Sequence, residues 1–546
     1  MLGPVAAGLW GAVLPAFGHL PAAGFEGPSL EAWERLFGWA GIWPASLLSV
    51  TTGFAATGLS LVIVTLITAG WWGTRPFAWL ERALSPLLSV PHAAAAFGIA
   101  FLIAPSGWAM RLVSPWLTGM ERPPDVLIVG DPWGAAMVAG LVAKEVPFLL
   151  LMTLAALGQV RARSSLFVAR SMGYGRMSAW LKTVFPAIYA QIRLPVYVVL
   201  AYSMSVVDVA LILGPSTPAT LSVQIVRWMS DPDLAMRLVA SAGALWQLAL
   251  VIGALALWRL GEIVVARRGL VWAAGGSRAA WLESLRPPAL GLASLSAILV
   301  LAGLAILALW SFAGIWRFPE ALPDALTLRS WSRHSGGLGQ ALSDTAMIAI
   351  LATALALVLT IGCLEAEFRR DRPIGRTGLW LLYLPLIVPQ TAFLPGLQTL
   401  LLRVGADRGA GPVIAAHLVF VLPYVFLSLG DPWRAWDRRQ AVAAATLGAS
   451  PLRVLLGVRL PMLLRPVLVA GAIGMAVSVG QYLPTLLIGG GRVATLTTEA
   501  VALSSSGDRR AIGVFGIAQT LAALLPFALA TIVPLVLWRH RRGLHG

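Results

Sequence analysis

Six polar side chains lie inside long apolar stretches of the sequence, where a polar group has few partners. They are Lys144, Glu145, Tyr202, Asp208, Gln481 and Tyr482. A buried carboxylate could bind a cation or carry a proton, and a tyrosine ring could stack on a positively charged or heteroaromatic molecule. If the apolar stretches cross a membrane, each charge costs at least ~2.5–3.5 kcal/mol and should face a cavity or a partner. We therefore treat these six residues as candidates for lining a path through the membrane.

The same residues also have a purely structural interpretation. Polar groups between helices often form hydrogen bonds or ion pairs that only hold the helices together, and Lys144 with Asp208 is such a candidate pair. Lys144 and Glu145 are neighbours in the sequence and point about 100° apart on a helix, so we do not expect them to pair with each other. Both interpretations stay open at the level of the sequence.

No set of residues predicts catalysis or metal binding. Cys363 is the single cysteine, which excludes an internal disulfide, and the six histidines show no ligand spacing. We expect His417 to be a packed residue. The sequence contains no GxxxxGK[ST] phosphate-binding loop. It therefore predicts that the chain is not an enzyme and binds no metal or cofactor itself.

The elements that would position these residues are transmembrane helices. Of the 546 residues, 58% are hydrophobic and only 12% are charged, whereas soluble chains average about 25% charged residues. Twelve apolar runs are each near the ~20 residues that a helix needs to cross a bilayer. The sequence thus predicts an all-α polytopic membrane protein with about 12 transmembrane helices. The runs lie at about 3–20, 46–71, 86–105, 133–157, 194–213, 238–258, 289–313, 341–363, 378–402, 411–430, 466–488 and 514–538.

The distribution of charge predicts the orientation. Twelve spans place both termini on one side, and the loops of that side carry the excess behind the net charge of +16. The tail "RHRRGLHG" (539–546) belongs to the same side. By the positive-inside rule this side is the cytoplasm, so the charge reports topology and gives no reason to expect nucleic-acid binding. The N-terminus lacks a basic segment, and we interpret it as a retained first span.

The chain contains an internal repeat. "MGYGRMSAWLKTVFP" (172–186) aligns with "LGASPLRVLLGVRLP" (447–461), and Ala219-Thr220-Leu221 aligns with Ala494-Thr495-Leu496, both at a separation of 275 residues. A single separation held without a gap indicates duplication. We predict two six-span halves, residues 1–258 and 289–546, joined by a basic cytoplasmic linker at 259–288. Because six is even, the halves are parallel and not inverted.

Both copies of the first motif lie between the fourth and fifth spans of their half. We name them the first loop (residues 159–190) and the second loop (residues 431–465). Each reads as two short surface helices separated by a glycine, Gly173 or Gly448, that we expect to have a positive φ. Ser450-Pro451 is a typical start for the second of these helices. A single such loop would be an ordinary interfacial loop, but a duplicated one suggests a duplicated partner.

The two loops resemble the "EAA" loop of ATP-binding cassette importer permeases, in which E-A-A is followed by Gly and then by Ile-x-Leu-Pro. In the second loop Ala443, Ala444, Gly448, Leu460 and Pro461 match this pattern. In the first loop the matching residues are Ala169, Gly173 and Pro186. The motif glutamate is absent from both copies. The chain as a whole resembles the fused, twelve-span type I permeases, and most closely the thiamine-type members.

This resemblance implies partners and a role for each loop. In such permeases the second helix of the loop docks in a groove of a cytoplasmic ATP-binding subunit, so two loops imply two copies of that subunit, which bind the ATP and Mg²⁺. A separate periplasmic binding protein would deliver the substrate. The resemblance also implies the bacterial inner membrane, with lipid around the spans. The substrate would be a small solute, with thiamine or another cation favoured by Glu145 and Asp208.

A second class of function is also compatible with twelve spans in two parallel halves. A proton-coupled secondary transporter has the same outline, and Glu145 or Asp208 would then carry the proton. Copurification of an ATP-binding subunit with the chain would distinguish the two classes. A channel or an integral membrane enzyme has less support, since no catalytic residues cluster.

Overall fold

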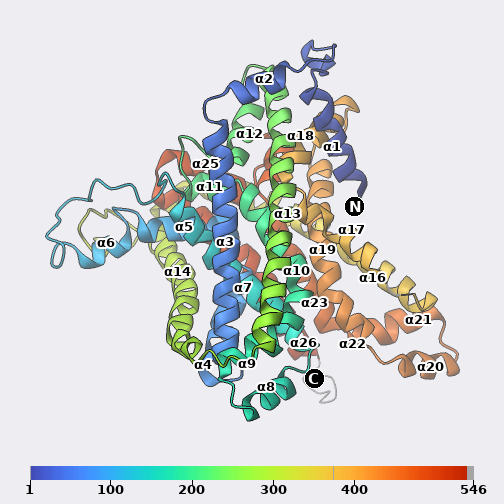
Figure 1. Cartoon of the computed structure of the whole chain (residues 1–546). Helices are drawn as coiled ribbons and strands as arrows, with labels where there is room; N and C mark the ends of the chain where they lie inside the picture. Colours follow the sequence, from blue (N-terminus) through green and yellow to red (C-terminus); the bar gives the residue numbers. More distant parts are fainter. Residues whose placement is uncertain (1, 373, 538–546) are drawn as a thin grey trace.

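The computed structural model describes residues 2–372 and 374–537, and within them the chain is a bundle of tilted helices (Figure 1). Its extended segments in these ranges form no strand, only two isolated bridges, Leu20 with Phe25 and Ala313 with Leu326. The basic tail 539–546, used above for orientation, lies outside the described residues. The predicted all-α polytopic membrane fold is confirmed.

The helices before residue 286 follow in this order. They are α1 (Leu2–Ala16), η1 (Pro21–Ala23), α2 (Glu31–Gly38), α3 (Ile42–Trp71), α4 (Arg75–Leu84), η2 (Ser85–Leu88), α5 (His92–Ile103), α6 (Trp108–Val113), α7 (Ala135–Leu157), α8 (Ala162–Ser171), α9 (Arg176–Thr183), α10 (Phe185–Ser205), α11 (Asp208–Leu213), α12 (Leu221–Met229), α13 (Met236–Ala274) and η3 (Ala280–Leu285).

The remaining helices make up the C-terminal part of the chain. They are α14 (Arg286–Phe312), α15 (Arg329–Arg333), α16 (Ser335–Arg370), α17 (Arg376–Ile387), α18 (Gln390–Arg403), α19 (Gly411–Arg434), α20 (Arg438–Thr446), α21 (Pro451–Val454), the π-helix η4 (Leu455–Arg459), α22 (Leu460–Met462), α23 (Leu464–Val479), α24 (Leu483–Gly489), α25 (Leu496–Leu503), η5 (Ser504–Ser506) and α26 (Arg509–Leu537).

The number of uninterrupted spans is lower than the twelve that hydropathy predicts. Among the described residues, nine helices are long and apolar enough to cross a membrane, or up to 11 if bent pairs count as single spans. Helix α1 is shorter, and α17 and α18 meet at 85° just before Gln390, where Pro389 precedes α18. The predicted spans 194–213 and 466–488 each break into a long and a short helix. Hydropathy detects apolar length but does not detect such bends.

The first helix of each half packs against the other half. Helix α1 packs against α18, and α14 packs against α5 (Figure 1). Both crossings use glycines: a Cβ on Gly396 would come within 1.9 Å of the Gly8 carbonyl oxygen, and one on Gly303 within 2.8 Å of the Gly98 carbonyl carbon. Small residues allow helix backbones to approach closely in membranes. The two halves are therefore interleaved.

Hydrogen bonds at the second repeated motif recur in both halves. The backbone N–H of Leu221, at the start of α12, donates to the Ser49 hydroxyl of α3 at 3.0 Å. The backbone N–H of Leu496, at the start of α25, donates to the Thr345 hydroxyl of α16 at 2.9 Å. The repeated residues thus occupy the same local position in the two halves.

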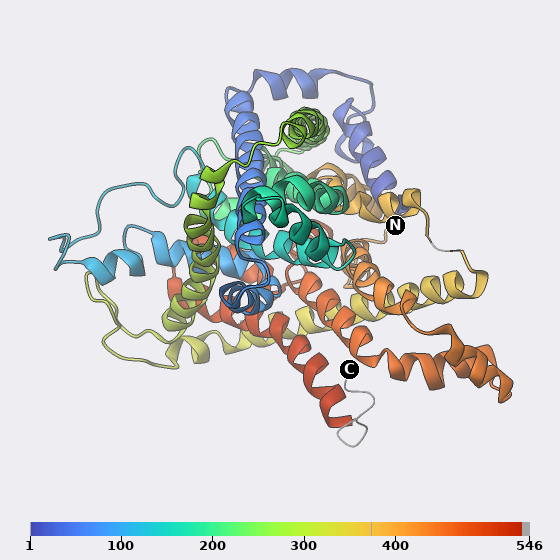
Figure 2. The same cartoon turned by 60° about the horizontal axis from the view of Figure 1, so that its bottom comes forward.

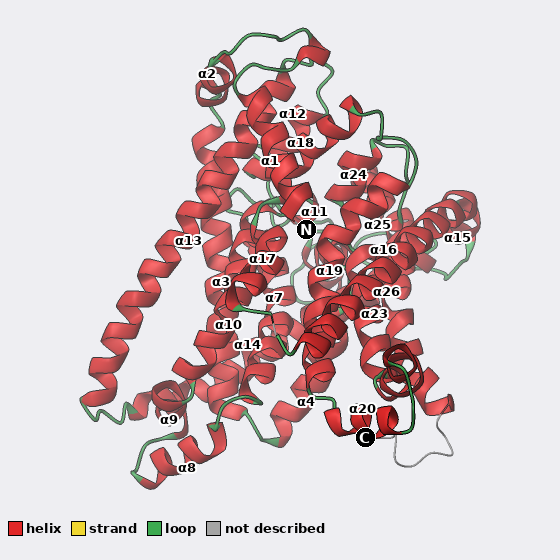
Figure 3. Ribbon diagram, turned by 90° about the vertical axis from the view of Figure 1, so that its right-hand side faces the viewer, coloured by secondary structure: helices red, strands yellow, loops and turns green. Residues whose placement is uncertain are grey.

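The two loops lie at the same end of the bundle. Figure 3 shows α8 and α9 of the first loop and α20 of the second loop at the lower end, with α2 and α12 at the opposite end. Figure 2, in which this lower end is turned toward the viewer, shows the two hairpins well apart. The two loops therefore lie apart on one face of the bundle.

Candidate functional site

Each loop turns on a glycine with a left-handed backbone. The φ angle is +83° at Gly173 and +82° at Gly448, as the sequence predicts. In the first loop the Tyr174 N–H donates to the Ala169 carbonyl at 3.3 Å, and the Gly173 N–H donates to the Arg170 carbonyl at 3.0 Å. This pair of bonds is a Schellman motif, which ends a helix sharply.

The second loop repeats this geometry. The Ala449 N–H donates to the Ala444 carbonyl at 3.1 Å, and the Gly448 N–H donates to the Ala445 carbonyl at 2.9 Å. Ala169 and Ala444 are separated by 275 residues, so the motif alanines accept equivalent bonds. Ala443, one residue earlier, is exposed. The match to the family pattern therefore corresponds to a shared turn.

The outermost helix of each loop carries exposed apolar side chains at matched positions. Phe167 and Met172 flank the end of α8, with Phe167 76% exposed. Val442 and Leu447 occupy the equivalent positions at α20, with Leu447 88% exposed. Large exposed apolar side chains therefore recur at matched positions of the two loops.

The second helix of the first loop is not free to dock. In α9 the residues Met177 to Trp180 are buried, and Trp180 packs on Trp72 with ring centroids 5.6 Å apart. The linker covers the same helix, because Glu283 accepts a 2.7 Å hydrogen bond from the Met177 N–H. The free surface of the first loop is thus on its first helix, α8, whereas the resemblance implied docking by the second helix. Pro186 follows at the start of α10 and is exposed.

The second loop is less buried than the first. Neither α20 nor α21 contains a buried residue. The Ser450 hydroxyl caps α21 by accepting from the Arg453 N–H, and Pro451 occupies the first helical position, as the sequence predicts. Leu460 and Pro461 follow in α22, where Leu460 is partly buried and Pro461 is exposed.

Lys144 does not pair with Asp208. Its ammonium group is buried and donates to the backbone carbonyls of Leu87 at 2.5 Å and Val90 at 2.6 Å. These carbonyls lie at the end of η2 and just before α5, where the helix is interrupted. Lys144 therefore satisfies backbone groups that the break in the helix leaves free, and the suggested ion pair with Asp208 is wrong.

Glu145 has a partner that the sequence analysis missed. Its carboxylate lies 3.5 Å from the His92 Nε2, and the His92 ring packs against Tyr202 with centroids 5.0 Å apart. His92 begins α5 and remains 36% exposed, while Glu145 is buried. No spacing signal in the sequence connects residues 92, 145 and 202, because three different helices bring them together.

Asp208 extends this group to the second half. It is buried as the first residue of α11, which packs against α5 and α7, and its carboxylate lies within electrostatic range of His92, Tyr202 and Tyr482. Tyr424 of α19 lies within electrostatic range of Glu145. We name this group the polar cluster: His92, Glu145, Tyr202, Asp208, Tyr424 and Tyr482. It combines two carboxylates with three half-buried tyrosines from both halves.

The other polar residues lie outside this cluster or have local partners. Gln481 lies in the break between α23 and α24, next to Tyr482, and its carbonyl accepts from the Thr485 hydroxyl at 3.2 Å. His417 is buried, with Ser478 and Thr485 hydroxyls at 2.8 and 2.9 Å from its two ring nitrogens, so it is a packed residue. Within the described ranges no group of His, Cys, Asp and Glu could hold a metal ion.

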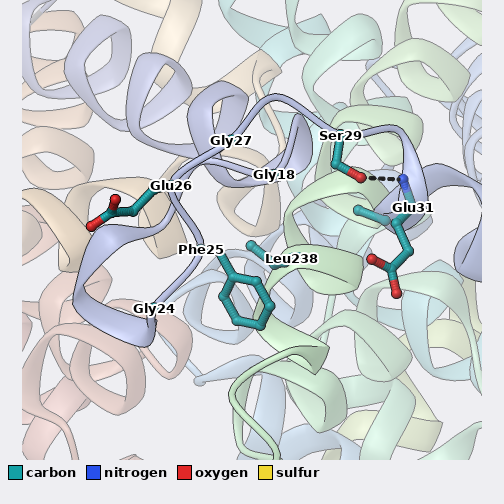
Figure 4. A pocket seen from close by; sticks show the side chains of 9 residues that line it. Gly18, Gly24, Phe25, Glu26, Gly27, Ser29, Glu31 and Leu238 are labelled. Atoms are coloured by element: carbon teal, nitrogen blue, oxygen red, sulfur yellow. Dashed lines mark hydrogen bonds between the residues drawn. The ribbon is translucent and has the colours of Figure 1, made fainter.

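A separate pocket lies at the end opposite the loops. Figure 4 shows this cavity of about 230 Å³, formed by the segment from Gly18 to Ala32 and by Leu238. The Ser29 hydroxyl there accepts from the Glu31 N–H at 3.0 Å. Glu31 is exposed and pairs with Arg35, so the pocket contains no buried charge. It contains none of the polar cluster residues.

Interleaved membrane helices and two matched surface loops fit the membrane-spanning subunit of a transporter. Residues 352–540 match the family described as binding-protein-dependent transport system inner membrane component. Over 521 residues the chain is 31% identical to the inner membrane ABC transporter permease protein YnjC of Escherichia coli (strain K12), covering 94% of this chain and 93% of the relative. The chain therefore belongs to this family of ABC importer permeases.

Two further relatives match only part of the chain. The spermidine/putrescine transport system permease protein PotC of Haemophilus influenzae is 23% identical over 221 residues, which cover 40% of this chain and 81% of the relative. The putrescine transport system permease protein PotI of Escherichia coli (strain K12) is 33% identical over 153 residues, covering 24% of this chain and 53% of the relative. None of these names supports the expected thiamine-type assignment. Members of the family are permease subunits without catalytic activity of their own, in agreement with the missing phosphate-binding loop.

Proposed function

We propose that this permease imports a small organic cation, with one ATP-binding subunit docked on each loop and a periplasmic binding protein delivering the substrate. The family supplies the general role, since its members are inner membrane components of binding-protein-dependent transport. The number of ATP-binding subunits, the residues that meet them and the class of substrate are our proposal.

The proposal of two ATP-binding subunits rests on the two matched loops. The Phe167 and Met172 surface of α8 and the Val442 and Leu447 surface of α20 lie on the same face and occupy equivalent repeat positions. The partners bind ATP and Mg²⁺, and this chain contributes the docking helices. The same face carries the basic linker, so by the positive-inside rule we propose that it is the cytoplasmic face and that both termini lie on the same side. The halves are then residues 1–258 and 289–546, with the linker at 259–288.

The polar cluster supports a cationic substrate. Glu145 and Asp208 supply negative charge, while Tyr202, Tyr424 and Tyr482 supply aromatic faces that attract organic cations. The relatives PotC and PotI are named for the amines putrescine and spermidine, which are cations at neutral pH. Thiamine is also a cation with a heteroaromatic ring, so the chemistry of the cluster admits it. Lys144 lies beside Glu145 but faces backbone carbonyls, and Gln481 adjoins Tyr482 at the break in the second half.

The family assignment removes the reason to consider a proton-coupled secondary transporter. ABC importers take their energy from ATP hydrolysis by a partner subunit, and the permease needs no proton carrier. Glu145 also has His92 as a close partner. The carboxylates are therefore assigned to substrate contact in our proposal.

The test is uptake and ATP hydrolysis by the complex that copurifies with the tagged chain. Proteoliposomes holding this complex and its binding protein would receive labelled putrescine, spermidine, thiamine or, as a neutral control, maltose. We expect at least one cation to be taken up and to stimulate ATP hydrolysis, and maltose to have no effect. Stimulation by maltose without stimulation by any of the cations would contradict the cation proposal, and absence of an ATP-binding subunit from the complex would contradict the docking proposal.

A further inference from the structure

Arg459 at the end of the π-helix η4 is a buried cation in a cage of aromatic rings. Its side chain is 2% exposed. The guanidinium carbon lies 4.0 Å from the ring centre of Phe368, 4.4 Å from that of Trp433 and 4.8 Å from that of Trp436. Cation–π contacts of this kind strengthen when the cation is desolvated. Phe368 belongs to α16, whereas Trp433 at the end of α19 and Trp436 just after it lie at the start of the second loop, and Arg459 lies near the end of that loop.

Two hydrogen bonds fix the guanidinium group inside the cage. Arg459 Nη1 donates to the Glu365 carboxylate of α16 at 3.0 Å, and Nη2 donates to the Trp433 carbonyl of α19 at 2.9 Å. Glu365 also accepts a 2.8 Å bond from Arg369. A planar guanidinium group can satisfy both acceptors at once, whereas a lysine ammonium group cannot match this geometry. One side chain therefore joins the second loop to the ends of two long helices.

The local helix geometry is unusual at this point. Leu455–Arg459 form a π-helical turn between α21 and α22, and such turns insert an extra residue and occur frequently at functional sites. A buried charge also carries a desolvation cost that only good geometry offsets. A loop needed only to connect two helices would not require either feature.

The first loop is held by a different set of contacts. At the repeat position of Arg459 it has Val184, which is buried and apolar. Among its cations, Lys182 donates to the linker carbonyls of Trp272 at 3.1 Å and Ser277 at 2.5 Å, and Arg176 donates to the carbonyls of Ala69 and Trp72 at the end of α3. The first loop is thus fastened to the linker and to α3 by half-buried cations, while the second loop is fastened to α16 and α19 through the buried Arg459.

We propose that Arg459 is the positioning residue through which movement of the second loop reaches α16 and α19. The inference rests on the proposed docking of an ATP-binding subunit on that loop. Because Arg459 contacts both helices through one rigid group, displacement of the loop pulls on both together. Arg459 touches neither substrate nor nucleotide in this scheme, and its role is to transmit movement.

The test uses the assembled complex with its ATP-binding subunit and binding protein. The variants are Arg459→Met, Arg459→Lys and Glu365→Gln, and the matched control is Arg465→Met, which removes an exposed arginine six residues further along the chain. The assays are yield of complex, basal ATP hydrolysis, and uptake per complex of whichever cation the unaltered complex transports. A fluorescent label on Cys363, the single cysteine and exposed on α16, reports movement beside the cage when ATP is added.

We expect Arg459→Met to assemble with its ATP-binding subunit and to keep basal ATP hydrolysis. Uptake per complex should fall on the order of tenfold, within the usual range of coupling between distant sites, and the response of the Cys363 label to ATP should disappear. Arg459→Lys and Glu365→Gln should fall between Arg459→Met and the unaltered chain, because each keeps part of the contact set. Arg465→Met should behave as the unaltered chain.

Three results would overturn the inference. If Arg459→Met keeps the uptake of the unaltered chain and its label response to ATP, movement reaches α16 by another route. Failure of all three variants to assemble would make Arg459 a folding residue. Equal loss in Arg465→Met would assign the effect to surface charge. A failure of the unaltered chain to bind any ATP-binding subunit would instead contradict the proposed function, so the two failures are distinguishable.

Discussion

At the scale of single residues, the family pattern requires glycine at Gly173 and Gly448 because the backbone there has a positive φ. A residue with a Cβ pays about 1–2 kcal/mol in the left-handed region, and a β-branched residue is especially disfavoured there. The surroundings of the two glycines differ. A Cβ on Gly448 would meet nothing within 4 Å, whereas one on Gly173 would lie 3.2 Å from the Arg278 guanidinium group.

We predict that Gly448→Val and Gly173→Val both insert into the membrane but lose coupling to the ATP-binding subunit. The strained turn should reorient α20 or α8 and so weaken docking, with a loss of about 1–2 kcal/mol at Gly448, where strain is the only cost. The effect at Gly173 should be larger because of Arg278. Substrate-stimulated ATP hydrolysis by purified complexes provides the measurement, with Gly457→Ala in the same loop as control. Normal stimulation in both valine variants would argue against docking through these loops.

The second prediction at this scale concerns Asp208. Since Lys144 bonds to the carbonyls of Leu87 and Val90, Asp208→Asn leaves no lysine uncompensated. We therefore expect normal assembly, thermal stability and basal ATP hydrolysis. Cation uptake should fall about tenfold or more, because the loss of a hydrogen bond to a charged group costs ~1.5–3 kcal/mol. Uptake and stability would be measured on the same preparation. A stable Asp208→Asn complex with unchanged uptake would remove Asp208 from the path.

At the scale of elements, the crossings between halves depend on close backbone contact. At the α5–α14 crossing Gly98 and Gly303 face each other, and at the α1–α18 crossing Gly396 faces Gly8 and Gly11. The obstacle to a larger residue is backbone, which cannot rotate away. At each crossing, glycines of the first helix of one half meet a glycine of the other half.

We predict that Gly303→Leu disrupts the assembly of the two halves. Its side chain would meet the Gly98 backbone, where even a Cβ comes within 2.8 Å, and overpacking of this kind costs on the order of 1–3 kcal/mol or more. Gly291→Leu on the same helix is the control, because a Cβ there meets nothing within 4 Å. The yield of monodisperse protein and its thermal denaturation in detergent would be compared. Equal behaviour of the two variants would show that α14 can move away from α5.

The sequence predicted the elements whose signal is local. Apolar length located each long helix, and the repeated glycines located both turns with the correct sign of φ. The breaks at Val206–Val207 and Gly480–Gln481 were missed, because a run stays apolar whether or not its helix bends. The partners of Lys144, Glu145 and Arg459 were also missed or misassigned, since they depend on which distant helices come together in the folded chain.

At the scale of the whole molecule, the two halves share the loop motif, but different contacts hold the two loops in place. The linker begins within α13, which continues as one helix to Ala274. The C-terminal end of the linker packs over α9, where Glu283 accepts from the Met177 N–H. The second loop has Arg459 in its cage instead. Although the repeat predicts parallel copies, the face that carries the two loops is therefore not symmetric.

The presence of both loops on one polypeptide has a consequence for genetics. In a permease built from two identical subunits, every codon change alters both docking positions at once. Here a single codon change in the second loop leaves the first loop of the same molecule intact. Under the proposed docking, alleles of this one gene would therefore report how a transporter behaves when an ATP-binding subunit engages only one of the two loops.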